Sequence, residues 1–193
     1  MELTPLIQQD LDSIISFLKV AEGLKNTLRS SHTSNGREES VAEHTWRLCL
    51  LAMMLQKYYP NINYNRLIKI LLNHDMGEII NGDIPAIYQD PTVDKSHEER
   101  KDFLEVISPL TEEQQNEMLE LWDEYNEVSS PEAKLAKALD KIETVLQHLD
   151  GKNPDDFDYE FNLGYGTKYT SLDPVISYLR GYVDDETRKR IKV

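Results

Sequence analysis

The chain has 193 residues, 39% of them apolar, with a single cysteine and a formal net charge of −14, so it is long enough for one domain with a buried core. The acidic balance argues against large DNA or RNA as a partner, because nucleic-acid binding depends on Lys and Arg neutralising phosphates. The lone Cys49 cannot form an internal disulfide and the longest apolar run, Leu48 to Leu55, is too short to span a bilayer, so we expect a cytoplasmic protein that binds no membrane.

Apolar residues recur at spacings of three and four along most of the chain, which predicts helices. They are expected at about 5–26, 41–59, 64–80, 95–107, 111–127 and 131–150, followed by short helices near 172–182 and 184–191. Two capping boxes, Ser40 with Glu43 and Thr111 with Gln114, mark helix starts. The segments 30–35 and 151–171 are expected to be irregular, and no segment alternates as a β-strand does. The sequence therefore predicts a single all-α domain over residues 1–193.

The predicted helix 64–80 carries ionisable residues on a face that its apolar residues mark as buried. Apolar residues three, four and seven positions earlier place both His74 and Asp75 on the inward side. Burying an imidazole and a carboxylate side by side without partners costs about 2–7 kcal/mol or more. A metal ion would compensate this cost. Glu78 extends the same face by one turn, and the helix is expected to end at Gly82 and Asp83.

Two further candidate ligands lie on other predicted helices. His44 is in the first turns of the helix that begins after Ser40, and leucines four, seven and eleven positions later put it on the buried face. Asp140 is the best fourth candidate, because it lies beside the apolar stripe of helix 131–150 rather than on its exposed back. Two imidazoles and two carboxylates without a thiolate suit one divalent ion such as Mn, Co, Fe or Zn.

The order His44, His74-Asp75, Asp140 resembles the H…HD…D metal signature of the HD-domain phosphohydrolases. Three local strings are similar as well: Glu-Ser-Val-Ala-Glu-His at 39–44, His-Asp-x-x-Glu-x-x-x-Gly-Asp-x-Pro at 74–85, and Ala-Leu-Asp-Lys-Ile-Glu at 138–143. The resemblance covers a core of about residues 24–150 and points to the branch that contains the 5′-deoxynucleotidases. It implies a helical bundle with the metal site between helices, hydrolysis of nucleoside 5′-monophosphates, mainly 2′-deoxyribonucleotides, and a homodimer.

Neighbouring branches of the superfamily fit this sequence less well. Hydrolases of guanosine tetraphosphate carry an acidic pair after the His-Asp, whereas Glu78 is followed here by Ile79. Cyclic-dinucleotide phosphodiesterases have a lysine in place of Glu78 and a Gly-Tyr-Pro motif, which Gly164-Tyr165-Gly166 does not match. Deoxynucleoside triphosphate hydrolases usually have a histidine at this point, which is also missing.

The resemblance also implies roles for residues beside the metal. Glu78 and Asp83 would orient water and supply a proton to the leaving 5′ oxygen, and Asp83 would also reach a sugar hydroxyl. Arg29, fifteen residues before His44, would hold the phosphate, because a planar guanidinium suits its oxygens. Ser30 stands where the deoxynucleotidase pattern has an aromatic residue that packs on the sugar. We therefore expect weak selection against ribonucleotides.

Structural alternatives stay open for several of these residues. Instead of acting at the site, Asp83 could simply form an Asx-turn before Pro85. Arg37 could equally contact phosphate or form a surface salt bridge. His32, His97 and His148 lack the motif context and are expected to be loop, cap and surface residues. The alternative function is a catalytically idle HD scaffold that senses a nucleotide. The enzyme is favoured, because a sensor needs no proton-transfer groups.

Overall fold

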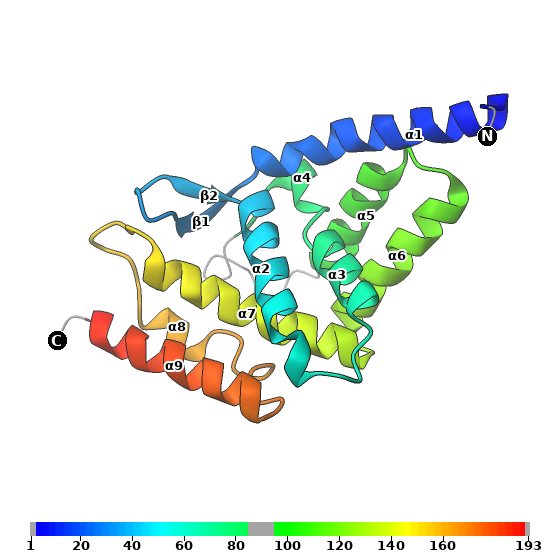
Figure 1. Ribbon diagram of the computed structural model, residues 1–193. Helices are drawn as coiled ribbons and strands as arrows, with labels where there is room; N and C mark the ends of the chain where they lie inside the picture. The colour runs from blue at the N-terminus through cyan, green and yellow to red at the C-terminus, as the bar shows by residue number, and fades with distance from the viewer. Residues whose placement is uncertain (1–2, 85–94, 192–193) are drawn as a thin grey trace.

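The computed structural model describes residues 3–84 and 95–191, and Pro85, the last residue of the His-Asp string, lies outside them. Most of the described chain is helical (Figure 1). In chain order the elements are α1 (Pro5–Ala21), the 3₁₀ helix η1 (Glu22–Lys25), β1 (Leu28–His32), β2 (Glu38–Ser40), α2 (Val41–Leu55), the 3₁₀ helix η2 (Gln56–Tyr58), α3 (Tyr64–Asn73), α4 (Glu78–Asn81), α5 (Lys95–Ile107), α6 (Glu112–Glu127), α7 (Pro131–Asp150), α8 (Phe161–Gly164) and α9 (Pro174–Arg190).

Helix α7 forms the centre of the fold. It packs against α2, α3, α6 and α9 (Figure 1). Leu135, Leu139, Ile142 and Val145 along it are buried in the main hydrophobic cluster. Burying each such side chain contributes about 1.5–3 kcal/mol to folding. Asp140 is therefore carried by a helix that is held on several sides.

A second hydrophobic cluster lies around α5 and α6. Phe103 and Trp122 stack there with ring centroids 5.5 Å apart, and Val41 and Met76 belong to the same cluster. Leu71, at the end of α3, belongs to the main cluster instead. The chain between α3 and α4 thus passes from one cluster to the other, and both clusters hold it in place.

The helices with strong local signals have the predicted positions. Helix α7 spans the predicted 131–150 and α5 the predicted 95–107, and both predicted capping boxes are formed. The predicted helices 5–26 and 41–59 end in the 3₁₀ helices η1 and η2. The two short helices predicted near the C-terminus are one helix, α9, because residues 182–185 continue its hydrogen-bonded turns.

The predicted helix 64–80 is interrupted where the ionisable residues lie, so the prediction of a continuous helix was wrong. Residues 74–77 form a turn between α3 and α4. Hydrogen bonds from Met76 N to Asn73 O, 3.3 Å, and from Glu78 N to Asp75 O, 3.1 Å, span three residues rather than four. A Cβ on Gly77 would lie only 3.0 Å from the Glu99 carbonyl oxygen of α5. The apolar pattern continues through this turn, so it gave no signal of the break.

The strands β1 and β2 correct the prediction of a polar loop at 30–35 without strands. They pair antiparallel, with Leu28 opposite Ser40 and His32 opposite Glu38. Most residues of both strands are polar, so the apolar alternation that identifies strands is missing. The hairpin brings Arg29 against α7, where Arg29 Nη2 donates to Thr144 Oγ1 at 3.2 Å.

Candidate metal centre

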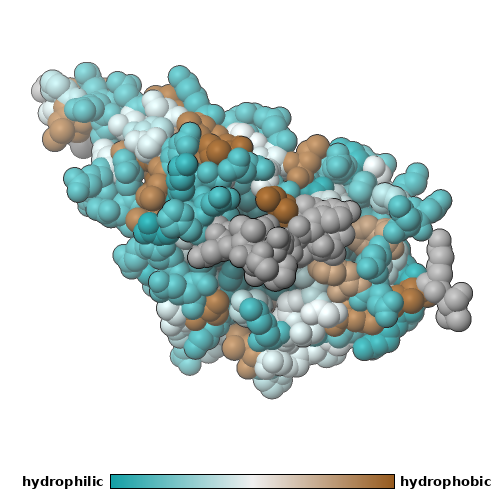
Figure 2. Space-filling model, turned by 180° about the vertical axis from the view of Figure 1, so that it is seen from behind, coloured by the Kyte–Doolittle hydropathy of each residue, from teal (hydrophilic) through white to brown (hydrophobic). Residues whose placement is uncertain are grey.

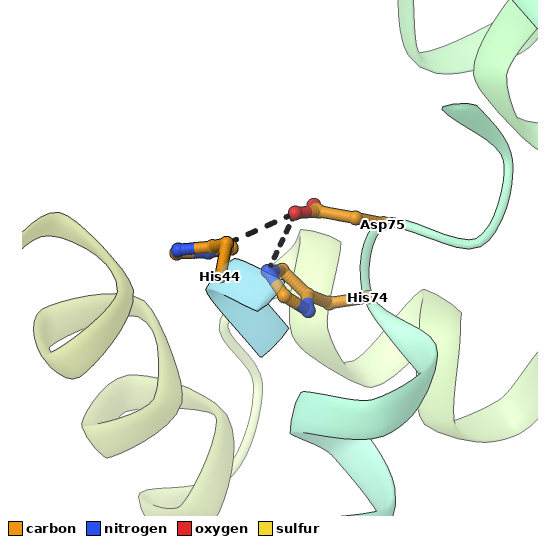
Figure 3. A group of neighbouring side chains, drawn as sticks. All are labelled: His44, His74 and Asp75. Atoms are coloured by element: carbon orange, nitrogen blue, oxygen red, sulfur yellow. Dashed lines mark ion pairs between the residues drawn. The ribbon is translucent and has the colours of Figure 1, made fainter. Parts of the chain in front are cut away.

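The four predicted metal-binding residues come together from three parts of the fold. The possible ligand atoms of His44, His74 and Asp75 lie within 4.8 Å of one another (Figure 3). Asp75 Oδ2 is 3.9 Å from His44 Nε2 and 3.0 Å from His74 Nε2. Asp140 Oδ1 lies 3.3 Å from His44 Nε2. Helix α2, the turn 74–77 and α7 thus each supply part of one cluster.

Both histidines use Nδ1 to contact the protein and direct Nε2 to the cluster. His44 Nδ1 donates to the buried carboxylate of Glu143, and His74 Nδ1 donates to the Leu71 carbonyl oxygen at 2.7 Å. Both Nε2 atoms are buried and, among the described residues, have no hydrogen-bond partner. Leaving each unpaired costs about 1–3 kcal/mol. A metal ion bound at Nε2 would remove that cost, so the donor set fits a divalent ion.

Asp140 is held by groups that leave one of its oxygens for the cluster. Its Oδ2 accepts a hydrogen bond from Tyr125 Oη at 2.7 Å and forms an ion pair with Lys141 Nζ at 2.8 Å. The Tyr125 ring also packs edge-on against His74, with centroids 4.9 Å apart. These contacts fix the Asp140 carboxylate, and Oδ1 remains on the side of His44.

The electrostatic field at the cluster favours a cation. Burial raises the pKa of Asp75, but the neighbouring His74 outweighs it and lowers the pKa to about 2. Burial and the charge of Arg29 lower the pKa of His44, yet Glu143 and Asp140 outweigh both and raise it to about 9. Carboxylates that hold a proton on a buried imidazole would equally stabilise a divalent ion at the same point.

Glu78 and Asp83 lie beside this cluster. Burial, together with the charges of Asp75 and Asp83, raises the pKa of Glu78 to about 10. Glu78 Oε2 is buried and has no hydrogen-bond partner within the described ranges. Burial also raises the pKa of Asp83, which the charge of Arg29 opposes. Both carboxyl groups are thus close enough to Asp75 and Arg29 for those two charges to affect their pKa values.

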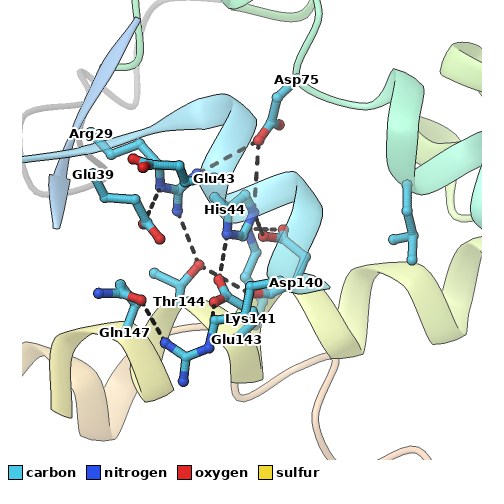
Figure 4. A network of polar contacts seen from close by, with 12 residues as sticks. Arg29, Glu39, Glu43, His44, Asp75, Asp140, Lys141, Glu143, Thr144 and Gln147 are labelled. Carbon is cyan, nitrogen blue, oxygen red and sulfur yellow. Dashed lines mark hydrogen bonds and ion pairs between the residues drawn. The ribbon is translucent and has the colours of Figure 1, made fainter. Parts of the chain in front are cut away.

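Arg29 is fixed next to the cluster by a polar network (Figure 4). Its Nη1 lies 3.6 Å from Asp75 Oδ2 and its Nε 3.6 Å from Glu39 Oε2. Thr144, which accepts from Arg29, donates in turn to the Asp140 carbonyl oxygen at 3.0 Å. The guanidinium is buried with the cluster on one side, a position from which it can bind an anion there.

Other polar residues have structural partners instead. Arg37 is exposed and its Nη1 donates to Glu43 Oε2 at 2.8 Å, which is the salt-bridge alternative. His148 was expected at the surface but is buried, with Nδ1 2.7 Å from Asn162 Oδ1. His148 lies on the side of α7 that faces the segment before α9. No local sequence pattern indicated that this segment packs against α7.

Sequence reasoning missed the residues that support the cluster. Glu143 and Thr144 follow Asp140 by three and four residues, so all three share one face of α7, and this spacing could have identified them. Tyr125 is on another helix, where nothing local distinguished it from an ordinary core residue.

A helical bundle that brings two histidines and two aspartates together defines a candidate metal-dependent hydrolase. The chain belongs to the HD domain family, whose model matches residues 21–180. It is 34% identical over 137 residues to the human protein named 5'-deoxynucleotidase HDDC2, covering 70% of this chain and 66% of the human one, just under two thirds. It is 32% identical over 187 residues to 5'-deoxynucleotidase hdd1 of Schizosaccharomyces pombe, covering 92% and 90%.

Solved structures confirm the expected fold. The crystal structure of a predicted metal-dependent phosphohydrolase from Magnetospirillum magnetotacticum superposes with a TM-score of 0.71, covering 94% of this chain and 95% of that one. The two sequences are 24% identical, so this likeness concerns the fold alone.

Proposed function

We propose that this protein is a metal-dependent phosphomonoester hydrolase that releases phosphate from nucleoside 5′-monophosphates, with 2′-deoxyribonucleotides preferred. The observation that carries the proposal is the pair of buried Nε2 atoms, on His44 and His74, that face two carboxylates and have no other partner in the described chain. The names of the relatives support the nucleotide substrate. The alternative, an idle nucleotide sensor, gives Glu78 no role.

His44, His74, Asp75 and Asp140 would hold one divalent ion through nitrogen and oxygen ligands, with Mn, Co, Fe and Zn as candidates. The chemistry supplied by such an ion, when bound, is polarisation of the phosphate and a lower pKa for water. We also propose that the whole of residues 1–193 forms one HD domain around this site.

The residues around the cluster would position the substrate and move one proton. Arg29 would bind terminal phosphate oxygens and meet their charge in the transition state. As the water oxygen bonds to phosphorus, the bond from phosphorus to the 5′ oxygen breaks, and the Glu78 carboxyl group would donate its proton to the departing oxygen. One proton of the attacking water would return to the Glu78 carboxylate, so that the nucleoside and phosphate are released and Glu78 is protonated again. Asp83 would accept a hydrogen bond from a sugar hydroxyl, which favours 5′ over 3′ esters.

Phosphate release from a panel of nucleoside monophosphates, with several divalent metals, tests this function. Glu78→Gln should lose about 10²–10⁴-fold in kcat, the usual contribution of a proton-transfer group, and should keep its metal. Glu105→Gln, an exposed position on α5, is the matched control and should be unchanged. Turnover of Glu78→Gln within a few-fold of wild type would contradict the role of Glu78. Nucleotide binding without hydrolysis under every metal would establish the sensor instead.

The sugar preference is tested separately with matched deoxy and ribo substrates. A steric or apolar contact at the 2′ position discriminates by about 1–3 kcal/mol. Since Ser30 replaces the expected aromatic residue, we predict weak discrimination. The deoxy-over-ribo ratio of kcat/KM should correspond to the lower end of that energy range. A ratio above about 1,000 lies outside it and would show that another residue excludes the 2′ hydroxyl.

We propose further that the protein is a cytoplasmic homodimer. Among the described residues, every helix is either too short or too polar to cross a membrane. Support for a dimer comes from the outer face of α2, where four large apolar side chains are exposed at helical spacing: Trp46, Leu50, Met53 and Met54. We refer to these four residues as the α2 stripe. Exposed apolar patches of this kind commonly mark protein contacts.

A further inference from the structure

Lys137 lies close to the metal cluster, yet neither the motif nor the proposed ligand set includes it. It is on α7, one turn before Lys141 and on the same side as Asp140. Its Nζ lies 3.7 Å from the centroid of the Tyr125 ring, a cation–π contact. The same ring donates its hydroxyl to Asp140 and packs against His74. The Tyr125 ring therefore contacts the ammonium group and two cluster residues.

In the part of the chain that the structure describes, Lys137 has no direct ion pair. Lys141 pairs with Asp140 at 2.8 Å, but within residues 3–84 and 95–191 no carboxylate lies within ion-pairing distance of Lys137. Burial and the charge of Lys141 lower the pKa of Lys137 to about 8, although Asp140, Asp75 and Glu99 act in the opposite direction. The ammonium is thus partly desolvated, and an anion bound beside it would offset that cost.

Lys137 and the Thr144 partner of Arg29 lie on either side of Asp140 along α7. Arg29 is hydrogen-bonded to Thr144, seven residues after Lys137, and Asp140 lies between the two. Seven residues of α-helix correspond to about 10 Å. A ligand held at Asp140 would therefore have a guanidinium on one side and an ammonium, on a flexible four-carbon stem, on the other.

We propose that Lys137 is a substrate-binding residue whose ammonium group contacts a phosphate oxygen on the side of the cluster away from Arg29. A phosphomonoester has three terminal oxygens over which charge is spread. The cluster, Arg29 and Lys137 would each meet one of them. The proposal deepens the proposed function and rests on it for the identity of the substrate, but binding of inorganic phosphate tests it independently.

The experiment compares Lys137→Met with Lys134→Met in the metal-loaded protein. Lys134 is on the same helix, exposed and one turn earlier, so its substitution makes the same change in net charge. The dissociation constant of inorganic phosphate is measured by calorimetry, and kcat and KM are measured for a nucleoside 5′-monophosphate. Loss of a charge-assisted hydrogen bond should weaken phosphate binding and raise KM by about 10- to 100-fold for Lys137→Met. Lys134→Met should match wild type, and Lys137→Arg should recover most of the affinity.

A purely structural role for Lys137, as support for the Tyr125 ring, gives a different result. Metal content and Tm of Lys137→Met would then fall, while the phosphate dissociation constant at saturating metal would stay within about twofold of wild type, and that outcome overturns the proposal. If phosphate binding depends on Lys137 but the wild type hydrolyses no nucleotide, the proposed function fails and this binding site stands. If nucleotides are hydrolysed and neither phosphate affinity nor KM changes, only the role of Lys137 fails.

Discussion

At the residue scale, His44 shows how a residue on another helix fixes a buried imidazole in an orientation that suits metal binding. Glu143 accepts from His44 Nδ1 and is itself almost fully buried, with 1% exposure. The contact sets which nitrogen carries the proton and leaves Nε2 for the cluster. A carboxylate in this position also raises the basicity of the imidazole as a ligand.

We predict that Glu143→Gln weakens metal binding by about 10- to 100-fold, the usual effect of removing such a partner. Gln keeps the size of the side chain and an oxygen that accepts from Nδ1, so the loss would come from the missing charge. Competition with a chelator of known affinity measures the effect, and Glu113→Gln, exposed on α6, is the control. Equal metal affinity in the two variants would exclude an electrostatic role for Glu143.

That His44, His74, Asp75 and Asp140 lie close together was predictable from the sequence, whereas the residues around them were only partly so. His44, His74 and Asp75 stand out because ionisable residues occupy positions where helical spacing demands apolar ones, and the motif order adds Asp140. Tyr125 has no such mark, since a tyrosine in a helix is an ordinary core residue until its hydroxyl is seen to meet Asp140.

At the element scale, α4 ends in a backbone conformation that requires glycine. Gly82 has φ 81° and ψ 168°, a region that only glycine commonly adopts, and it aims the chain so that Asp83 lies beside the cluster. Gly181 offers a contrast, because it lies within α9 and, like Gly82, would hold a Cβ with nothing within 4 Å. Both positions therefore have room for a Cβ, and only the backbone conformation differs between them.

The same substitution should have opposite effects at these two glycines. Gly82→Ala should destabilise the protein by about 1–3 kcal/mol through backbone strain. Gly181→Ala should stabilise it by about 0.5–1 kcal/mol, because alanine loses less backbone entropy in a helix. Urea denaturation followed by circular dichroism measures both. A gain in stability for Gly82→Ala would mean that the turn can relax to a conformation open to other residues.

The contact between α3 and α6 should make stability depend on pH. Arg66 Nε donates to Glu124 Oε2 at 2.7 Å, and Ser130 also donates to this carboxylate. Burial raises the pKa of Glu124, but these hydrogen bonds outweigh it and lower the pKa below its ordinary value. Because the pKa of Glu124 is lower in the folded state, its stabilising contribution to folding is present above the unfolded-state pKa of about 4.3. This contribution is lost as the pH falls below that value.

Glu124→Gln should therefore be less stable than wild type at pH 7 by about 1.5–3 kcal/mol, the value of a hydrogen bond to a charged group. The difference should shrink as the pH falls from about 5 to 3, because the wild-type carboxylate becomes protonated. Thermal or urea unfolding of both proteins across this range measures it. A constant difference from pH 7 to pH 3 would show that the charge of Glu124 does not matter.

Helix bounds were predictable where capping residues and apolar spacing agreed, as in α7. They were not predictable where tertiary contacts override local preference. The turn 74–77 depends on the approach of α5 to Gly77, and the β1–β2 hairpin depends on the contact of Arg29 with α7. Both features lie at the candidate site, and both involve residues far apart in sequence.

At the scale of the whole molecule, the charge of −14 contrasts with the cations near the cluster. Figure 2 shows one face of the protein as mostly hydrophilic, with scattered apolar patches. Arg29, Lys137 and Lys141 are concentrated around the cluster on β1 and α7. Once a divalent ion offsets the carboxylates of the cluster, these cations would help to attract a small anion within the screening distance of about 10 Å at 0.1 M salt, whereas a long polyanion would meet the acidic surface.

The same charge bears on assembly. If two copies join through the α2 stripe, apolar burial must overcome repulsion between chains that each carry −14. We predict a wild-type mass of twice the 22.4 kDa chain, with a dimer dissociation constant that falls as salt is raised from about 0.05 to 0.5 M, because salt screens the repulsion and leaves the apolar contact. Sedimentation equilibrium measures both.

Met54→Glu should give monomers, since it places a charge in the stripe, whereas Tyr178→Glu, an equally exposed position on α9, should remain dimeric. A dimer unaffected by Met54→Glu would place the interface elsewhere on the molecule, and a monomeric wild type at all salt concentrations would rule out the homodimer.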